Sequence, residues 1–137
     1  METISNPSKE EIGEILKGAK RIAVVGLSDN PERTSHEVSK VMQEAGYKII
    51  PVNPTVDEVL GEKAVSSLSD IEEPIDIVNV FRRSEFVPAI AEEAAQTDAN
   101  VFWTQLGVVS KEGFEIAKNS GKTVVMDRCI KVEHSLI

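Results

Sequence analysis

The feature that most constrains the fold of this chain is the alternation of short apolar runs with longer amphipathic segments. Five Val- and Ile-rich runs have the length of strands, at 21–27, 47–54, 75–81, 99–107 and 122–128. Helical patterns lie between most of them and before the first, at 8–20, 34–45, 84–97 and 110–121. Strands that alternate with helices form βαβ units, and continuously apolar strands indicate a parallel sheet covered on both faces. The sequence therefore predicts an α/β fold, a Rossmann-like doubly wound parallel five-stranded sheet, with strand order 3-2-1-4-5.

Serine residues mark three of the expected helix starts. Ser8, Ser84 and Ser110 each precede a helical pattern, and serine is a favoured N-cap residue. The stretch 57–73 lacks a clear pattern and reads as a loop with one short helix.

The length and charge of the chain limit the kinds of partner that it can have. Its 137 residues fit a single domain over 1–137, with an N-terminal helical segment over 1–20 and a C-terminal tail over 129–137. The net charge of −8 argues against the basic face that nucleic acid or an anionic membrane requires, but a small anion needs only a few local cations. We expect no nucleic-acid or membrane partner, and either a homodimer or an unidentified protein partner is possible.

The N-terminal residues and the single cysteine indicate the cellular compartment in which the protein is expected. Cys129 has no partner in the chain for a disulfide or a multi-cysteine metal site. No signal peptide is evident, and no run approaches the ~20 apolar residues of a membrane span. We therefore expect a cytoplasmic protein.

The arginines are gathered after the predicted strands. Only Arg21 lies elsewhere, and the others are Arg33, Arg82, Arg83 and Arg128. The carboxyl ends of parallel strands meet at one edge of the sheet, where α/β folds bind their ligands. Because guanidinium groups match phosphate oxygens in a bidentate geometry, the pattern predicts an anion site at this edge. The alternative is that each arginine pairs with one of the abundant Glu and Asp residues.

The loop after the first strand supports an anion site. Gly26 allows a close backbone turn, Ser28 adds a hydroxyl group and Arg33 adds charge. Thr34 and Glu37 have the spacing of a capping box, so a helix is expected to begin at Thr34 or the next residue. Its free N–H groups would point into the same pocket as Arg33, which suits a diphosphate. The alternative is an ordinary strand-to-helix loop with a good cap.

The identity of the diphosphate follows from what this loop lacks. An NAD site typically has Gly-x-Gly-x-x-Gly and an acidic residue at the end of the second strand. Here only the first glycine is present, and Asn53 stands where the acid would be. The pattern argues against an NAD site and weakens the prediction of an NADP site, so an NAD(P)-binding regulatory domain is kept only as an alternative.

Five motifs resemble, in this order, those of the small stand-alone CoA-binding proteins of bacteria, the YccU-like family: VVGLSDNPERTS, VNP, DIVNVFRRSE, WTQLGV and VVMDRCIKVEH. That family is similar to the CoA-binding N-terminal domain of the succinyl-CoA synthetase alpha subunit. The resemblance covers roughly residues 20–130. It implies that coenzyme A lies across the carboxyl edge of the sheet.

The resemblance also implies roles for individual residues. The first loop would hold the pyrophosphate through Gly26, Leu27, Ser28, Pro31, Arg33 and Ser35. The turns at Asn53–Pro54 and Phe81–Arg82 would contact the adenosine and its phosphate, and Gln105 and Gly107 would approach the pantetheine arm. The larger ligases carry a phosphohistidine in a further domain that this chain does not match. The expected function is therefore non-catalytic binding of coenzyme A or a CoA thioester.

Cys129 is the candidate for chemistry, because it follows the fifth predicted strand. The neighbouring Arg128 would favour the thiolate, and His134 could serve as its base. The competing interpretation is an unreactive, half-buried cysteine with His134 in a mobile tail. We therefore predict no catalytic residue and no metal ligand, and the alternative is a CoA-dependent enzyme or enzyme subunit that uses Cys129.

Overall fold

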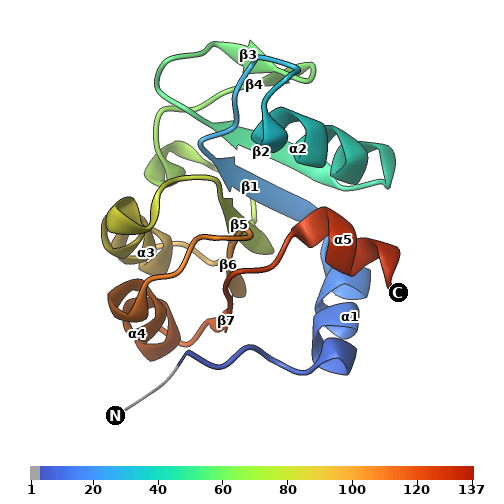
Figure 1. Cartoon of the computed structure of the whole chain (residues 1–137). Helices are drawn as coiled ribbons and strands as arrows, with labels where there is room; N and C mark the ends of the chain where they lie inside the picture. The colour runs from blue at the N-terminus through green and yellow to red at the C-terminus, as the bar shows by residue number, and fades with distance from the viewer. Residues whose placement is uncertain (1–3) are drawn as a thin grey trace.

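Five parallel strands form the central sheet of the computed structural model, which describes residues 4–137 (Figure 1). They are β1 (Arg21–Val25), β2 (Lys48–Val52), β5 (Ile77–Val80), β6 (Val101–Thr104) and β7 (Thr123–Val125). Each falls inside a predicted apolar run, and nearly every residue of the three middle strands is buried. The predicted Rossmann-like α/β sheet is confirmed.

Helices cover both faces of this sheet (Figure 1). One face carries α1 (Lys9–Gly18), α2 (Thr34–Glu44) and α5 (Ile130–Ser135), and the other carries α3 (Val87–Ala95) and α4 (Lys111–Asn119). Each face has its own apolar core, so both sides of the sheet are excluded from water. None of the helices in the described part of the chain is long and apolar enough to span a bilayer.

Two of the three predicted serine caps are confirmed. Ser8 Oγ accepts from Glu11 N at 3.1 Å, and Ser110 Oγ accepts from Gly113 N at 3.0 Å. The third prediction is wrong, because the segment after β5 starts with a 3-10 helix, η2 (Ser84–Phe86), and α3 begins only at Val87. Ser84 Oγ instead accepts from Val109 N at 3.0 Å, which ties this segment to the loop after β6.

The strand order differs from the prediction of 3-2-1-4-5. The sheet runs β2-β1-β5-β6-β7, so the third parallel strand pairs with the first and not with the second. The unpatterned stretch after β2 is a hairpin, β3 (Glu58–Val59) with β4 (Glu62–Lys63), followed by the 3-10 helix η1 (Leu68–Asp70). This connection carries the chain past β1. Both orders keep β1 between two strands, so its apolar run is compatible with either.

The two ends of the chain also differ from expectation. Residues 1–3 of the predicted N-terminal segment lie outside the described residues. The predicted tail over 129–137 is largely the helix α5, which begins after Cys129 and lies against the other helices on its face of the sheet (Figure 1). Lys131 Nζ donates to Glu37 Oε1 at 2.8 Å and so joins α5 to the first turn of α2.

The topological switch point lies between β1 and β5, because the chain leaves these two neighbours in opposite directions. Their carboxyl ends are very close: Phe81 N donates to Val25 O at 2.9 Å. A Cβ atom on Gly26 would lie 2.7 Å from the carbonyl oxygen of Phe81, and Gly26 has φ +88°. Both the backbone conformation and the close approach therefore require glycine.

Replacement of Gly26 by alanine is expected to lower the free energy of unfolding by about 2–4 kcal/mol, since strain at positive φ and overlap with Phe81 act together. Urea denaturation measures the change. Gly121→Ala is the matched control: Gly121 has φ +91° but open space around it, so a loss of only about 1 kcal/mol is expected. Equal losses in the two variants would show that the contact with Phe81 does not matter.

Candidate functional site

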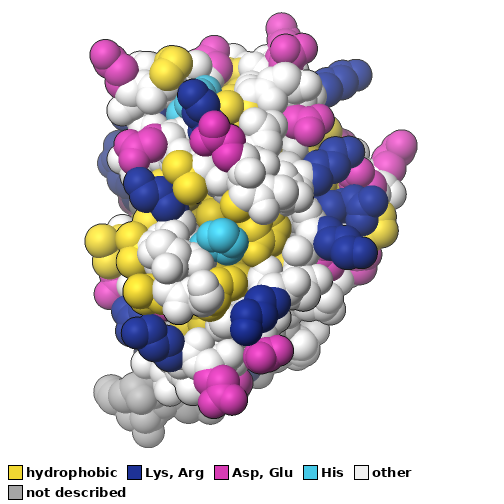
Figure 2. All heavy atoms as spheres, turned by 90° about the vertical axis from the view of Figure 1, so that its right-hand side faces the viewer, with side chains coloured by type: hydrophobic (Ala, Val, Ile, Leu, Met, Phe, Trp, Pro, Cys, Tyr) yellow, Lys and Arg dark blue, Asp and Glu magenta, His cyan; other side chains and the backbone are white. Residues whose placement is uncertain are grey.

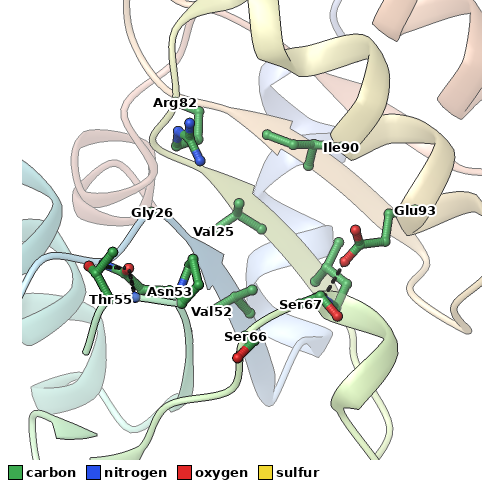
Figure 3. A pocket seen from close by; sticks show the side chains of 12 residues that line it. Val25, Gly26, Val52, Asn53, Thr55, Ser66, Ser67, Arg82, Ile90 and Glu93 are labelled. Atoms are coloured by element: carbon green, nitrogen blue, oxygen red, sulfur yellow. Dashed lines mark hydrogen bonds between the residues drawn. The ribbon is translucent and has the colours of Figure 1, made fainter. Parts of the chain in front are cut away.

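A cavity of about 520 Å³ opens over the carboxyl ends of β1 and β2. In Figure 3, Val25 and Val52 form its floor, Ile90 and Glu93 reach it from α3, and Arg82 lies beside Gly26 at one end. Ser66 and Ser67 enter from the segment before η1, with Asn53 and Thr55 on the side away from α3 (Figure 3). The cavity therefore combines an apolar floor with a polar rim.

A second cavity, of about 650 Å³, lies over the ends of β5 and β6. It is lined by Thr34, Phe81, Arg82, Arg83, Ser84, Gln105, Leu106, Gly107, Val108 and Cys129. Arg82 lines both cavities, and so the two meet at the switch point. The first loop borders both, since Gly26 lines the first cavity and Thr34 the second.

The first loop is folded by hydrogen bonds of its own. Ser35 Oγ accepts from Ser28 N, and Ser28 Oγ in turn accepts from Asn30 N, both at 3.0 Å. Arg33 N donates to Asn30 O at 3.0 Å and closes the turn before α2. These bonds fix the shape of the loop before any ligand arrives. Ser28 and Ser35 therefore act first as structural residues.

The predicted capping box at the start of α2 does not form. The helix begins at Thr34 as expected, but its N-cap residue is Arg33, which makes no side-chain cap. Glu37 pairs with Lys131 instead. Within residues 4–137, the N–H groups of Thr34 and Ser35 have no acceptor, so the helix start presents free donors at the border between the cavities.

The charge of Glu37 beside this helix start is balanced. The hydrogen bond and the positive charge of Lys131 hold the pKa of Glu37 below its usual value. The carboxylate of Glu37 raises the pKa of Lys131 in turn. The pair is charged at neutral pH and contributes no net charge, so it does not oppose an anion at the N-terminus of α2.

The arginines divide into paired and unpaired groups. In the part of the chain that the structure describes, Arg33 and Arg82 form no ion pair, and the guanidinium of Arg82 lies 4.5 Å from the centre of the Phe86 ring. Arg83 lies 3.6 Å from Glu85, and Arg21 lies 3.5 Å from Glu73, next to β1's amino end. The pairing alternative therefore describes Arg83, whereas Arg33 and Arg82 retain their charge for a ligand.

Arg128 uses its guanidinium within its own segment, because its Nη1 donates to the carbonyl oxygen of Asp127 at 2.9 Å. It lines neither of the two cavities. Of the four arginines predicted at this edge, only Arg83 is ion-paired within residues 4–137, and of the other three only Arg82 lines a cavity.

Asn53 has a structural reason to be an amide. Its Nδ2 donates to Leu27 O at 2.9 Å, and its Oδ1 accepts from Thr55 N at 2.9 Å and from Thr55 Oγ1 at 2.8 Å. An acidic residue could not donate to Leu27. The position at which an NAD site has its acid is here a link between the first loop and the end of β2.

The turn after β6 is also held from within. Gln105 is buried, and its Nε2 donates to Asn79 Oδ1 at 2.6 Å. Gly107 N donates to Asp127 Oδ1 at 2.7 Å, and Gly107 has φ +86°. Asn79 and Asp127 were not among the predicted site residues; the signal for Asn79 is a polar residue inside the apolar run IVNV.

Cys129 and His134 do not form a catalytic pair. Cys129 is half-buried in the wall of the second cavity. The ring of His134 packs edge-on against Tyr47, with centroids 5.6 Å apart and planes at 80°. Tyr47 directly precedes β2 and so lies near the opposite, amino edge of the sheet. Within residues 4–137 no hydrogen bond joins His134 to Cys129, so the structure does not bring the two together as a base and a thiol.

The predicted binding residues thus fall into two groups. Seven of them line a cavity: Gly26, Asn53, Pro54, Phe81, Arg82, Gln105 and Gly107. Five shape or flank the first loop: Leu27, Ser28, Pro31, Arg33 and Ser35. The structure adds Ser66, Ser67, Ile90 and Glu93 to the first cavity, from segments with no recognisable motif. Glu93 lies in an acidic part of α3 and accepts a hydrogen bond from Leu68 N.

Comparison with known proteins identifies relatives of the whole chain. A family model described as a CoA binding domain matches residues 20–135. The protein YneT of Bacillus subtilis (strain 168) is 65% identical over 133 residues, which cover 97% of this chain and 98% of YneT. A hypothetical protein from Pyrococcus horikoshii OT3 has the same fold, with a TM-score of 0.92 and 36% identity over 99% of this chain and 98% of that one.

A more distant relative belongs to a larger enzyme. The alpha subunit of acetate–CoA ligase (ADP-forming) II from Pyrococcus furiosus is 28% identical over 122 residues. The match covers 81% of this chain but only 27% of that subunit, so the chain corresponds to about a quarter of the ligase subunit.

Asn53→Asp tests the link between the first loop and β2. The carboxylate keeps the acceptor for Thr55 but loses the donor to Leu27, and we expect the free energy of unfolding to fall by about 1–2 kcal/mol. Chemical denaturation at pH 7 measures the loss. Unchanged stability would mean that the bond to Leu27 does not hold the loop.

Proposed function

The chain belongs to the CoA-binding domain family, and we propose that it binds coenzyme A or a CoA thioester non-covalently across the carboxyl edge of its sheet. The observation that carries this proposal is the pair of cavities that meet at Arg82 beside the first loop. The site has three parts in a row, and CoA has three parts of matching chemistry: a nucleoside, a diphosphate and an amide-containing arm.

The first cavity suits the adenosine. Val25, Val52 and Ile90 supply apolar surface for the faces of a base. The hydroxyl groups of Ser66 and Ser67 and the carboxylate of Glu93 supply acceptors for its amino group and for the ribose hydroxyls. Glu93 also disfavours a phosphate at its own end of the cavity, so the phosphates would lie at the Arg82 end.

The border between the cavities suits the phosphates. The free N–H groups at the start of α2 and the positive end of the helix dipole favour a diphosphate there. Arg33 and Arg82 supply the countercharge. Because the chain has a net charge of −8, an anion would depend on these two arginines for local attraction.

The second cavity suits the pantetheine arm. Its walls are mainly uncharged, and Gln105 contributes a buried amide to them. The arm's two amide groups need hydrogen-bond partners, and its terminal sulfur would lie toward Cys129. A role as a carrier or sensor of CoA follows from binding without chemistry.

Cys129 in the wall of the second cavity is the observation that favours the second candidate, a CoA-dependent enzyme. If the protein is such an enzyme, Cys129→Ser would abolish its CoA-dependent turnover. If it is a carrier, no turnover is expected, and the same variant would bind CoA with unchanged affinity in calorimetry.

Titration calorimetry of the full chain with CoA, dephospho-CoA, NAD and NADP tests the main proposal. We expect CoA to bind, and we expect Arg33→Ala and Arg82→Ala each to weaken it by about tenfold or more, because a charged hydrogen bond to phosphate is lost. Arg21→Ala is the control, since Arg21 pairs with Glu73 away from the site.

The panel distinguishes the possible failures. Binding of NAD or NADP in the absence of CoA binding would overturn the proposal in favour of a dinucleotide regulator. CoA binding that is equally strong in the Arg33 and Arg82 variants would mean that the phosphates lie elsewhere.

The single cysteine gives a site-specific readout of the arm. Because Cys129 lines the second cavity, saturating acetyl-CoA, which has no free thiol, should slow its alkylation by iodoacetamide about tenfold or more. Intact-protein mass spectrometry follows the reaction, and NADP at the same concentration is the control. An unchanged rate at a concentration that saturates the calorimetric site would exclude the arm from this cavity.

A further inference from the structure

We infer that the ligand is a CoA thioester with a short apolar acyl group, and that Leu106 selects it over free CoA. The inference rests on the proposed function and names the form of CoA that the second cavity fits best. Its basis is the set of exposed apolar side chains around that cavity.

Exposed large apolar side chains occur in only two places within residues 4–137. One group lies on α5 and at the end of the chain: Val132, Leu136 and Ile137. Figure 2 shows hydrophobic side chains gathered on that side of the molecule, with charged groups of both signs around them. The other group lies at the carboxyl edge beside the second cavity: Leu106 is 70% exposed, Val109 44% and Phe86 41%. Leu106 lines the cavity itself, and an exposed apolar side chain in a cavity wall marks a binding surface.

Leu106 is exposed because its turn is built to present it. Val108 N donates to Gln105 O at 3.0 Å, and Thr104 Oγ1 donates to Val108 O at 2.7 Å. Asp127 accepts from the N–H of Gly107 at 2.7 Å. These bonds on either side of Leu106 keep it out of the core. Because this backbone conformation leaves the leucine side chain exposed to water, a ligand that covers the side chain gains binding free energy from burial of apolar surface.

The segment after β5 supplies the rest of the apolar surface. The guanidinium of Arg82 lies over the ring of Phe86, which holds this ring at the surface. The bond from Val109 N to Ser84 Oγ joins this segment to the turn that carries Leu106. Two neighbouring connections, joined by this bond, therefore place exposed apolar side chains next to the residues that line the second cavity.

The lining of the cavity favours an apolar acyl group over a free thiol or an acidic one. Leu106 is the most exposed apolar side chain of the cavity wall, and methylene groups beyond a thioester carbonyl would add apolar surface to cover it, whereas a free thiol adds none. Among residues 4–137 no carboxylate lines the cavity, and of its two arginines Arg83 pairs with Glu85 while Arg82 also lines the first cavity. Phe81, Leu106 and Val108 are its apolar walls.

Calorimetry of the full chain with CoA, acetyl-CoA, butyryl-CoA, hexanoyl-CoA and succinyl-CoA tests the inference. Affinity should rise from CoA to butyryl-CoA, by roughly threefold for each methylene group that leaves water. Leu106→Ser should remove this rise with acyl length. Val132→Ser, which replaces an exposed apolar residue on α5, away from the cavity, should keep it.

The other possible results each contradict either the further inference or the proposed function. Equal affinity for CoA and all its thioesters would overturn the inference and leave the proposed function intact, whereas no binding of any member would overturn the proposed function itself. Tighter binding of succinyl-CoA than of butyryl-CoA would mean that the preferred acyl group is acidic and not apolar. An undiminished rise in the Leu106 variant, with its fold verified by urea denaturation, would remove Leu106 from its selecting role.

Discussion

The site depends on the contact between the carboxyl ends of β1 and β5. Gly26 and Phe81 lie so close that no side chain fits between them, and this contact places the first loop beside Arg82. The same contact marks the switch point of the sheet, from which the chain leaves to opposite sides. Gly26 lines the first cavity, Phe81 lines the second, and Thr34 at the start of α2 also lines the second. A wider separation of the two strands would pull the cavities apart.

The loop at this contact is held by the protein itself and not by a ligand. The side chains of Ser35 and Asn53 are hydrogen-bonded to the backbone of the loop: Ser35 Oγ accepts from Ser28 N, and Asn53 Nδ2 donates to Leu27 O. The helix that follows has no side-chain cap, and its first N–H groups are left without acceptors. An uncapped helix start is a small loss of stability in the free protein, and an anion would reverse it. Preorganisation of this kind lowers the entropy lost on binding.

Electrostatics in this acidic chain is arranged by local pairing. Glu37 is close to the free helix start, but Lys131 of α5 balances it. Arg83 and Arg21 are paired with glutamates, while Arg33 and Arg82 are not. The net charge of −8 therefore does not describe the carboxyl edge by itself, because within the described residues Arg33 and Arg82 stand there without an ion pair, beside the carboxylates of Asp29, Glu32 and Glu93. Helix α5, which the sequence suggested as a loose tail, takes part by carrying Lys131.

The sequence by itself determined the α/β class, the five strands and the glycine turn, because these depend on local periodicity and on single-residue backbone preferences. Of the twelve binding residues that it suggested, seven line one of the two cavities, because strand ends follow from the apolar runs. The tertiary structure decided the strand order, because both orders bury β1 equally well and the crossover after β2 has no helical pattern. Only the fold could show which arginines are paired, that Glu93 and Ser66 reach the first cavity, and that His134 packs against Tyr47. These facts depend on contacts between segments far apart in the chain, which local periodicity does not encode.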